Sequence, residues 1–224
     1  MRGQEKKKYY LLQQKEIEEI KKLNYKPSLL MHTCCGVCVS YPSLYLSEFF
    51  DLTLYYNNDN IYPESEYVRR FNELEKLISI YNETFNTNIK IVKTEYDGLN
   101  YLKKLQPLKD CKEKGARCHL CYSLRMKQAI DYAVENHFDY FTTVMTVSRQ
   151  KDSNVLNEIG ERLTKGKAIK YFFSDFKKDN GNEKTNELAN KYNLYHQQYC
   201  GCYYSYIDYQ FRKGKQRQNN DPVK

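Results

Sequence analysis

The sequence predicts an α/β protein with a Rossmann-like parallel sheet, helices on both faces, and a metal site at the carboxyl ends of its strands. Short apolar runs, typical of buried strands, alternate along the chain with helical patterns that are mostly about ten residues long or more. A helix between two strands favours a right-handed crossover and parallel pairing. Cysteines and other polar residues follow several of the strand-like runs, where ligands bind in such sheets.

Each expected element has a local signal. The strands are short apolar runs at residues 28–32, 52–56, 89–93, 138–144 and 170–173. The helices are expected at residues 9–23, from the first cysteines to 50, and at 64–84, 101–105, 121–136, 153–163 and 183–192. The signal is clearest over 64–84, where apolar residues recur three and four positions apart.

The chain is expected to have three parts. Residues 1–26 form an N-terminal helical extension, residues 27–211 a single α/β domain, and residues 212–224 a basic, disordered tail. The tail is poor in apolar residues, so it has little surface to bury against a core.

Polar groups follow three of the expected strands. Cys34 and Cys35 come after the first strand, residues 57–60 after the second, and residues 148–152 after the fourth. Cys118 and Cys121 stand at the start of a helix, whose positive end favours thiolate over thiol. Because the carboxyl ends of parallel strands share one edge of a sheet, we expect these groups to converge on one site.

Length and composition exclude some classes of protein. The 224 residues can bury a core without disulfides, and neither a signal-peptide pattern nor an apolar run of roughly 18 residues is present. We therefore expect a cytoplasmic protein with reduced thiols and no membrane association. The net charge of +8 is compatible with a nucleic-acid partner, although a Lys-, Asn- and Tyr-rich composition also arises from nucleotide bias.

The cysteines are the strongest chemical signal. Seven of the eight fall in three groups and Cys111 stands alone; the groups are Cys34-Cys35-Gly-Val-Cys38, Cys118-His-Leu-Cys121 and Cys200-Gly-Cys202. A C-x-x-C pair at a helix start suits a disulfide redox pair, half of a zinc site or half of an iron–sulfur site. Adjacent cysteines do not suit a zinc knuckle, so the spacing favours iron–sulfur over zinc, and zinc over thiol exchange alone. Cys111 and Cys38 also fit the role of small buried hydrophobes.

The Cys200-Gly-Cys202 segment has a different character. One intervening glycine allows the two sulfurs to meet, but in a small, strained ring. A strained disulfide is readily reduced, which favours a catalytic redox pair over a structural staple. The alternative is that both residues are cluster ligands or have no redox role.

Four motifs together resemble the QueH family of epoxyqueuosine reductases. They are Leu30-Met-His-Thr-Cys-Cys-Gly-Val-Cys38, Arg117-Cys-His-Leu-Cys-Tyr-Ser-Leu-Arg125, Phe141-Thr-Thr-Val-Met-Thr-Val-Ser148 and Tyr199-Cys-Gly-Cys-Tyr-Tyr-Ser205. The similarity runs in order over most of the chain. Two departures are Gly36-Val37, where the family usually has Ala-Pro, and Arg149-Gln150, where it usually has Pro-Tyr.

The resemblance implies a cobalamin-independent oxidoreductase, with residues 27–211 as its catalytic domain. Such an enzyme converts epoxyqueuosine to queuosine at the wobble position of tRNA with a GUN anticodon, using electrons from an unidentified donor. The resemblance also implies a 4Fe–4S cluster held by Cys34, Cys35, Cys118 and Cys121, and a redox-active disulfide between Cys200 and Cys202.

Further roles are hypotheses built on this resemblance. A second, mononuclear iron would polarise the epoxide oxygen as a Lewis acid, with Asp152 as its carboxylate ligand. His32 and His119, which flank cysteines, are candidate proton donors. Phosphates of the tRNA would meet basic residues; the candidates are Arg69, Arg70, Lys103, Lys104, Lys151, Lys177, Lys178 and the tail.

Two other classes of function compete with this interpretation. A zinc-stabilised RNA-binding module without catalysis would also use clustered cysteines, but the adjacent pair and the C-x-C segment argue against it. An ATP-dependent tRNA-thiolating enzyme would need a Gly/Ser-rich phosphate loop after the first strand, where this chain has cysteines.

Overall fold

The computed structural model describes residues 7–219, with side chains as far as residue 214, and it confirms the α/β class. Five parallel strands form one sheet in the order β3-β2-β1-β4-β5. The strands are β1 (Ser28–His32), β2 (Asp51–Tyr56), β3 (Lys90–Lys93), β4 (Tyr140–Thr143) and β5 (Lys170–Tyr171). The described helices are α2 (Lys8–Ile20), α3 (Gly36–Ser47), α4 (Glu64–Phe85), α5 (Gly98–Leu105), α6 (Ala116–Glu135), α7 (Ser153–Thr164), α8 (Gly181–Lys191) and α9 (Tyr203–Asn219), with short 3₁₀ turns η1 (Gln106–Leu108) and η2 (Val144–Val147).

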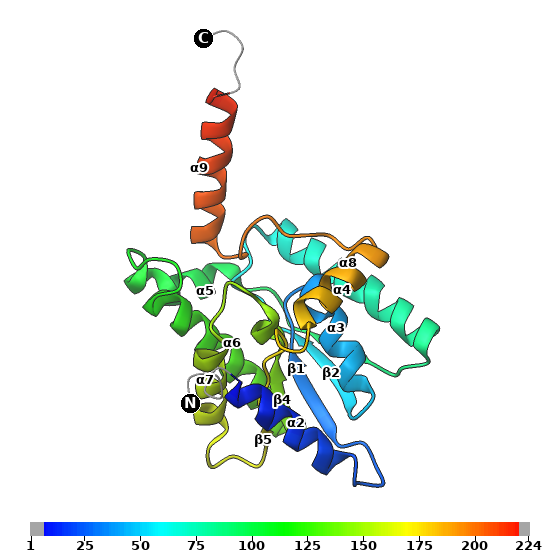
Figure 1. The fold of residues 1–224 in the computed structure, drawn as a ribbon. Helices are drawn as coiled ribbons and strands as arrows, with labels where there is room; N and C mark the ends of the chain where they lie inside the picture. Colours follow the sequence, from blue (N-terminus) through cyan, green and yellow to red (C-terminus); the bar gives the residue numbers. More distant parts are fainter. Residues whose placement is uncertain (1–6, 220–224) are drawn as a thin grey trace.

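Helices cover both faces of the sheet (Figure 1). Side chains of β1 alternate between two cores, as expected of a buried parallel strand. Leu29 and Met31 enter the core formed with α2, α3, α4 and α8, and Leu30 enters the core formed with α6 and α7. Helix α2 joins the first core through Ile17 and Ile20, so the N-terminal helix packs directly against the sheet domain.

The strand order places the chain reversal between β1 and β4. In sheets of this kind the crevice beyond the carboxyl ends at such a reversal is the usual ligand site. His32, the last residue of β1, pairs in register with Tyr55 and Thr143 of its two neighbours. Beyond it, Asn58 Nδ2 donates a 2.8 Å hydrogen bond to the backbone oxygen of Thr33. The segments after β1 and β2 therefore meet at this edge, as predicted.

The largest differences from the predicted boundaries concern helices α6 and α9, while the other ends shift by up to three residues. Helix α6 begins at Ala116 rather than at residue 121, so Cys118 and Cys121 both lie inside its first two turns. The tail was predicted to be disordered from residue 212, but helix α9 continues to Asn219, and residues 220–224 lie outside the described part. Helix α9 projects away from the sheet domain (Figure 1).

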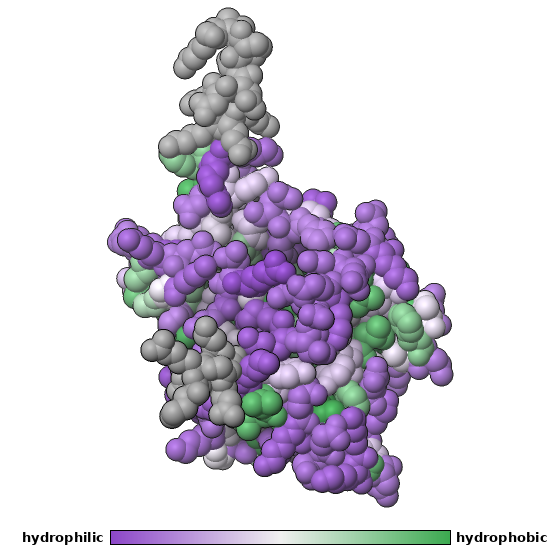
Figure 2. Space-filling view, in the orientation of Figure 1, coloured by the Kyte–Doolittle hydropathy of each residue, from purple (hydrophilic) through white to green (hydrophobic). Residues whose placement is uncertain are grey.

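The described surface carries no large apolar face in the view of Figure 2. That face is largely hydrophilic, and its hydrophobic side chains form small, separate groups. Within residues 7–219, no helix combines the length and the apolar character needed to cross a bilayer.

Candidate active site

The junction between β1 and α3 gathers three thiols. The Sγ atoms of Cys34, Cys35 and Cys38 all lie within 4.8 Å of one another, which makes them a potential metal site. Cys35 is the N-cap of α3 in an extended conformation, and its Sγ accepts a 3.4 Å hydrogen bond from the backbone N of Cys38. Cys34 and Cys35 are 8% and 2% exposed. The turn from strand to helix therefore points three sulfurs into one buried space; we call these residues the thiol trio.

Hydrogen bonding within the thiol trio favours one thiolate. Side-chain hydrogen bonds with Cys35 and Cys38 hold the pKa of Cys34 well below its usual value, and the charges of Arg125 and Lys151 add to this. The same contacts with Cys34 raise the pKa values of Cys35 and Cys38. A metal ion would displace these protons, since thiolates are the ligands that metals bind.

Arg125 is a buried cation beside the cysteines. The residue is 4% exposed, and its Nη2 donates a 2.6 Å hydrogen bond to Asn58 Oδ1, while its Nε has no partner. Within residues 7–219, no carboxylate pairs with it. Burial works to lower its pKa, but the thiols of Cys121 and Cys34 raise the pKa overall. A buried guanidinium is unfavourable unless an anion pairs with it. Since no carboxylate of the described residues does so, the nearby thiolates are the anions that can balance its charge.

Lys151 supplies a second positive charge at the same place. Burial works to lower its pKa, but the thiols of Cys200 and Cys34 raise the pKa overall, so its ammonium group stays charged. His32 lies nearby at the end of β1, completely buried, with its Nδ1 2.9 Å from Thr143 Oγ1 and its Nε2 without a partner. Burial and the charge of Arg125 hold the pKa of His32 well below its usual value, which keeps the imidazole neutral.

The first turns of α6 present Cys118 and Cys121. Tyr101 donates from its hydroxyl to Cys121 Sγ at 3.3 Å, and the backbone N of Lys114 donates to Cys118 Sγ at 3.3 Å. Burial raises the pKa of both thiols, which outweighs the lowering expected from the helix start. Neither residue belongs to the 4.8 Å group of the thiol trio. Cys121 and Cys34 nevertheless both interact with the charge of Arg125, so one cysteine of each pair lies near the same buried cation.

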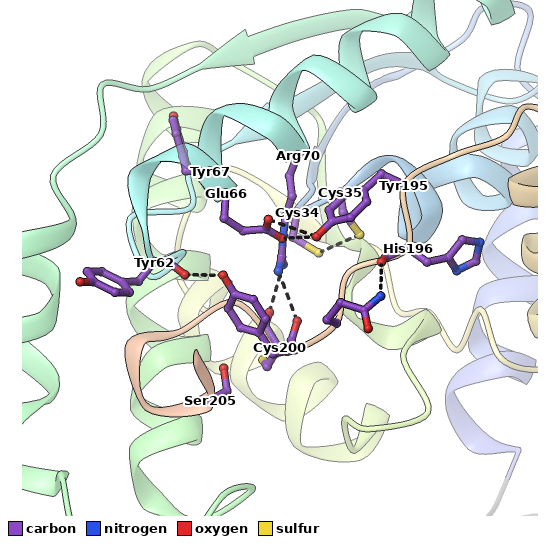
Figure 3. Close-up of polar contacts among 12 residues, drawn as sticks. Cys34, Cys35, Tyr62, Glu66, Tyr67, Arg70, Tyr195, His196, Cys200 and Ser205 are labelled. Atoms are coloured by element: carbon purple, nitrogen blue, oxygen red, sulfur yellow. Dashed lines mark hydrogen bonds and ion pairs between the residues drawn. The ribbon is translucent and has the colours of Figure 1, made fainter. Parts of the chain in front are cut away.

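A single guanidinium anchors the Cys200-Gly201-Cys202 loop (Figure 3). Arg70 of α4 is 1% exposed and forms a 2.8 Å ion pair with Glu66. Its two Nη atoms donate 3.2 Å hydrogen bonds to the backbone oxygens of Cys200 and Tyr199. Because it is buried and paired in this way, Arg70 is not the phosphate contact that its sequence position predicted.

Gly201 is needed at the centre of this loop. Its φ of +122° disfavours any side chain, and a Cβ here would lie 2.9 Å from Nη1 of Arg70. Its backbone oxygen accepts a 2.7 Å hydrogen bond from the backbone N of Tyr62. The glycine therefore lets the loop lie directly on the guanidinium.

Two cavities contain one thiol each of this loop. The Cys200 cavity, about 360 Å³, is lined by polar residues that include Ser148, Lys151 and Gln198. The Cys202 cavity, about 190 Å³, is mainly apolar. Both cysteines are free thiols, and Cys202 Sγ lies 3.4 Å from Ser205 Oγ. The structure contains no disulfide between them, so their pairing remains a proposal.

Two other predicted site residues are exposed. Asp152 is exposed and caps α7, where its Oδ1 accepts a 2.8 Å hydrogen bond from the backbone N of Asn154. A role as an iron ligand would require it to give up this cap. His119 is exposed on α6, 6.3 Å from the ring of Tyr122. Of the two candidate histidines, only His32 is buried, and it interacts with the charges of Arg125 and Lys151.

Sequence reasoning missed the roles of Arg125, Arg70 and Tyr101. Arg125 stands four residues after Cys121 on a helix, so helical periodicity placed its side chain on the same face. The contacts of Arg70 and Tyr101 join distant segments and leave no local pattern in the sequence.

Comparison with known proteins adds independent information. A family model described as epoxyqueuosine reductase QueH matches residues 29–208. The epoxyqueuosine reductase QueH of Streptococcus pyogenes serotype M1 is 36% identical over 184 residues, covering 82% of this chain and 72% of that protein. The proteins of the same name from Staphylococcus aureus and Staphylococcus epidermidis are 35% and 34% identical over 182 residues, covering 80% of this chain and 76% of each relative. The matched region contains every cysteine of the chain together with Arg125 and Lys151.

Proposed function

The chain belongs to the epoxyqueuosine reductase QueH family, and from that membership we propose that it reduces epoxyqueuosine to queuosine in tRNA. The epoxide oxygen leaves as water and an alkene remains, which consumes two electrons and two protons. The observation that carries the proposal is the family match over residues 29–208, which includes all the clustered cysteines. The proposed substrate is tRNA with a GUN anticodon, modified at its wobble base.

The proposed cofactor is a 4Fe–4S cluster held by Cys34, Cys35, Cys118 and Cys121, with a second, mononuclear iron nearby. The residues present fit such a group, because thiolates are the ligands of iron–sulfur clusters and Arg125 and Lys151 offset their negative charge. Cys38, the third member of the thiol trio, is a ligand available to the second iron. When bound, these metals would supply single-electron transfer and Lewis-acid polarisation of the epoxide oxygen.

Residues of the Cys200 cavity have roles that follow from their chemistry. Lys151 lines this cavity as a charged ammonium group, so it can donate a hydrogen bond to the epoxide oxygen. Oxidation of the Cys200 and Cys202 thiols to a disulfide releases two electrons and two protons, which match the needs of the reduction. An external donor of electrons must then reduce the disulfide again. Eight free thiols are in keeping with a reducing compartment such as the cytoplasm.

An anaerobic turnover assay tests this function. Protein purified without oxygen is incubated with a reductant and with tRNA that carries epoxyqueuosine, and the modified nucleoside is analysed by mass spectrometry. We expect loss of one oxygen atom from the nucleoside. Iron-loaded protein that leaves the epoxide intact would overturn the proposal. A colourless, zinc-containing protein that binds RNA without turnover would establish the zinc-stabilised RNA-binding module instead.

A matched pair of variants checks the role of the C-x-C loop. Cys200→Ala should keep its iron and slow turnover strongly, because one member of the thiol pair is gone. Cys111→Ala is the control, since Cys111 lies outside the three cysteine groups. Full turnover by Cys200→Ala would rule out the thiol pair as the source of electrons.

A further inference from the structure

The Cys202 cavity has walls suited to a flat ring. Five tyrosines and three leucines line it; they are Tyr62, Tyr96, Tyr101, Tyr203, Tyr204, Leu99, Leu102 and Leu105. Since about 10–15 Å³ of such volume suffices for one water molecule, the roughly 190 Å³ cavity has room for about 13 to 19 water-sized groups. That is enough for the ring atoms and substituents of a nucleobase. Leu99 is 76% exposed, so this apolar cavity has an accessible mouth.

Polar groups in the wall are mainly hydrogen-bond acceptors. Asn60 is 7% exposed, and its buried Oδ1 has no hydrogen-bond partner, which is costly unless a ligand supplies one. Asp59 and Glu64 also line the cavity, and Asp59 Oδ1 already accepts a 3.1 Å hydrogen bond from the backbone N of Asp97. Carboxylates repel a phosphate but accept hydrogen bonds from the amino and ring N–H groups of a base. The cavity therefore suits the base of a nucleotide and not its phosphate.

The cavity shares its walls with the proposed reaction site. Cys202 lies in its wall, and Tyr101 of the same wall donates a hydrogen bond to Cys121 Sγ. Cys200, two residues away, opens into the neighbouring Cys200 cavity. Two adjacent cavities, divided by one short loop, match two neighbouring nucleotides of a splayed single strand.

Positive charge lies around the mouth of the cavity. Lys103 and Lys104 are exposed in the last turn of α5, the helix that supplies the leucine wall. The guanidinium of Arg117 lies 4.0 Å from the ring centroid of Tyr204. A phosphate beside an inserted base would meet Lys103 or Lys104, since Arg117 is only 7% exposed and already donates to the backbone oxygen of Lys109.

We propose that the Cys202 cavity binds the unpaired base next to the modified nucleotide, and so holds the anticodon loop open at the reaction site. This inference rests on the proposed function, because that function makes a tRNA anticodon loop the substrate. The base stacks on tyrosine rings, and its edge bonds to Asn60 and Asp59. An apolar peptide or a lipid chain would leave those polar groups without partners.

Fluorescent RNA tests the cavity directly. A hairpin with the anticodon loop carries 2-aminopurine at either position next to the wobble base, and its fluorescence is followed as full-length protein is added. We expect quenching at one of the two positions. Tyr204→Ala should remove the quenching and raise the Kd roughly 5- to 150-fold, the range expected from loss of base–aromatic stacking. Leu99→Asp should also remove the quenching and raise the Kd, because it places a negative charge at the mouth of the cavity. Leu99→Asp keeps the test valid if Tyr204→Ala fails to fold, because Leu99 is exposed.

Tyr209→Ala is the matched control. Tyr209 lies on the same helix as Tyr204 but stacks on Tyr199, away from the cavity, so this variant should quench as the wild type does. If both cavity variants bind and quench like the wild type, the inference is wrong even if the enzyme reduces epoxyqueuosine. If the wild type quenches but never reduces the epoxide, the proposed function fails and the base cavity stands.

Discussion

The thiol trio and the Cys200-Gly201-Cys202 loop border the same site but are held in different ways. The thiol trio spans five residues at one strand–helix junction, and its geometry follows from β1 and the cap of α3. The C-x-C loop joins α8 to α9, and it depends on hydrogen bonds from Arg70, a side chain of α4. The thiol trio is therefore part of the core, whereas the C-x-C loop is held against the core by hydrogen bonds.

This difference suits two kinds of chemistry. A metal centre benefits from ligands that are already in place, because little conformational freedom is then lost on binding. A thiol pair that opens and closes a disulfide must change its S–S distance, which a loop can do without disturbing the core. Substitution of a cysteine in the thiol trio should therefore remove the bound metal. Substitution of Arg70, which anchors the C-x-C loop, should leave the metal bound and impair the chemistry of the Cys200 and Cys202 thiols.

Loss of a ligand from the thiol trio should have the largest effect. Cys34→Ala removes the sulfur whose thiolate is stabilised by Cys35 and Cys38, so bound iron and turnover should disappear together. Iron content and visible absorbance after anaerobic purification measure this. Cys111→Ala serves as control and should keep both. Full iron content and turnover in Cys34→Ala would show that Cys34 is not a ligand.

The loop anchor should give the next largest effect. Arg70→Met leaves Glu66 buried with its ion-pair partner gone, which should destabilise the fold by about 3–5 kcal/mol. Alkylation of Cys200 should become faster as the loop loosens, while iron content stays near the wild-type level. Chemical denaturation and timed thiol labelling measure the two effects, and Arg70→Lys should restore part of each.

Arg69→Met is the matched control for Arg70. Its guanidinium is exposed and lies 3.4 Å from the ring centroid of Tyr195, so its loss should cost no more than about 1 kcal/mol. Equal labelling rates in Arg69→Met and Arg70→Met would show that Arg70 does not anchor the loop.

Removal of one hydroxyl should give the smallest effect. Tyr101→Phe deletes the hydrogen bonds to the Sγ and the backbone oxygen of Cys121 and leaves the ring in place. A net loss of about 1 kcal/mol is expected, together with a small shift in the reduction potential of the iron–sulfur centre, because sulfur hydrogen bonds tune such potentials. Redox titration by visible absorbance measures the shift. An unchanged potential would indicate that Cys121 does not ligate the cluster.

Local sequence signals account for most of the fold. The central strands β1, β2 and β4 were found because a strand buried on both faces is a largely apolar run. The edge strands β3 and β5 are more exposed and were found as short apolar runs. The start of α6 was missed by five residues because its N-cap, Gly115, makes no side-chain capping bond. Helix α9 was missed because it is rich in polar residues and, apart from its first turn, it is mostly exposed.

The sequence predicted those parts of the candidate site whose residues are close to one another in the chain. Cys34 and Cys35 were singled out because they are adjacent in the sequence and follow a strand, whereas the sequence left the role of Cys38 open and the structure groups it with them. Arg125 bonds to a residue 67 positions away and Arg70 to one 130 positions away, and such contacts exist only after the sheet has formed. Asp152 was predicted to be an iron ligand because it follows β4, but in the structure its carboxylate caps the N-terminus of α7.

The most direct test of the proposed centre is the metal and sulfide content of protein purified without oxygen. If Cys34, Cys35, Cys118 and Cys121 hold a 4Fe–4S cluster, each chain should contain about four sulfide ions and about four irons, with one more iron if the second site is filled. Zinc without acid-labile sulfide would contradict the cluster.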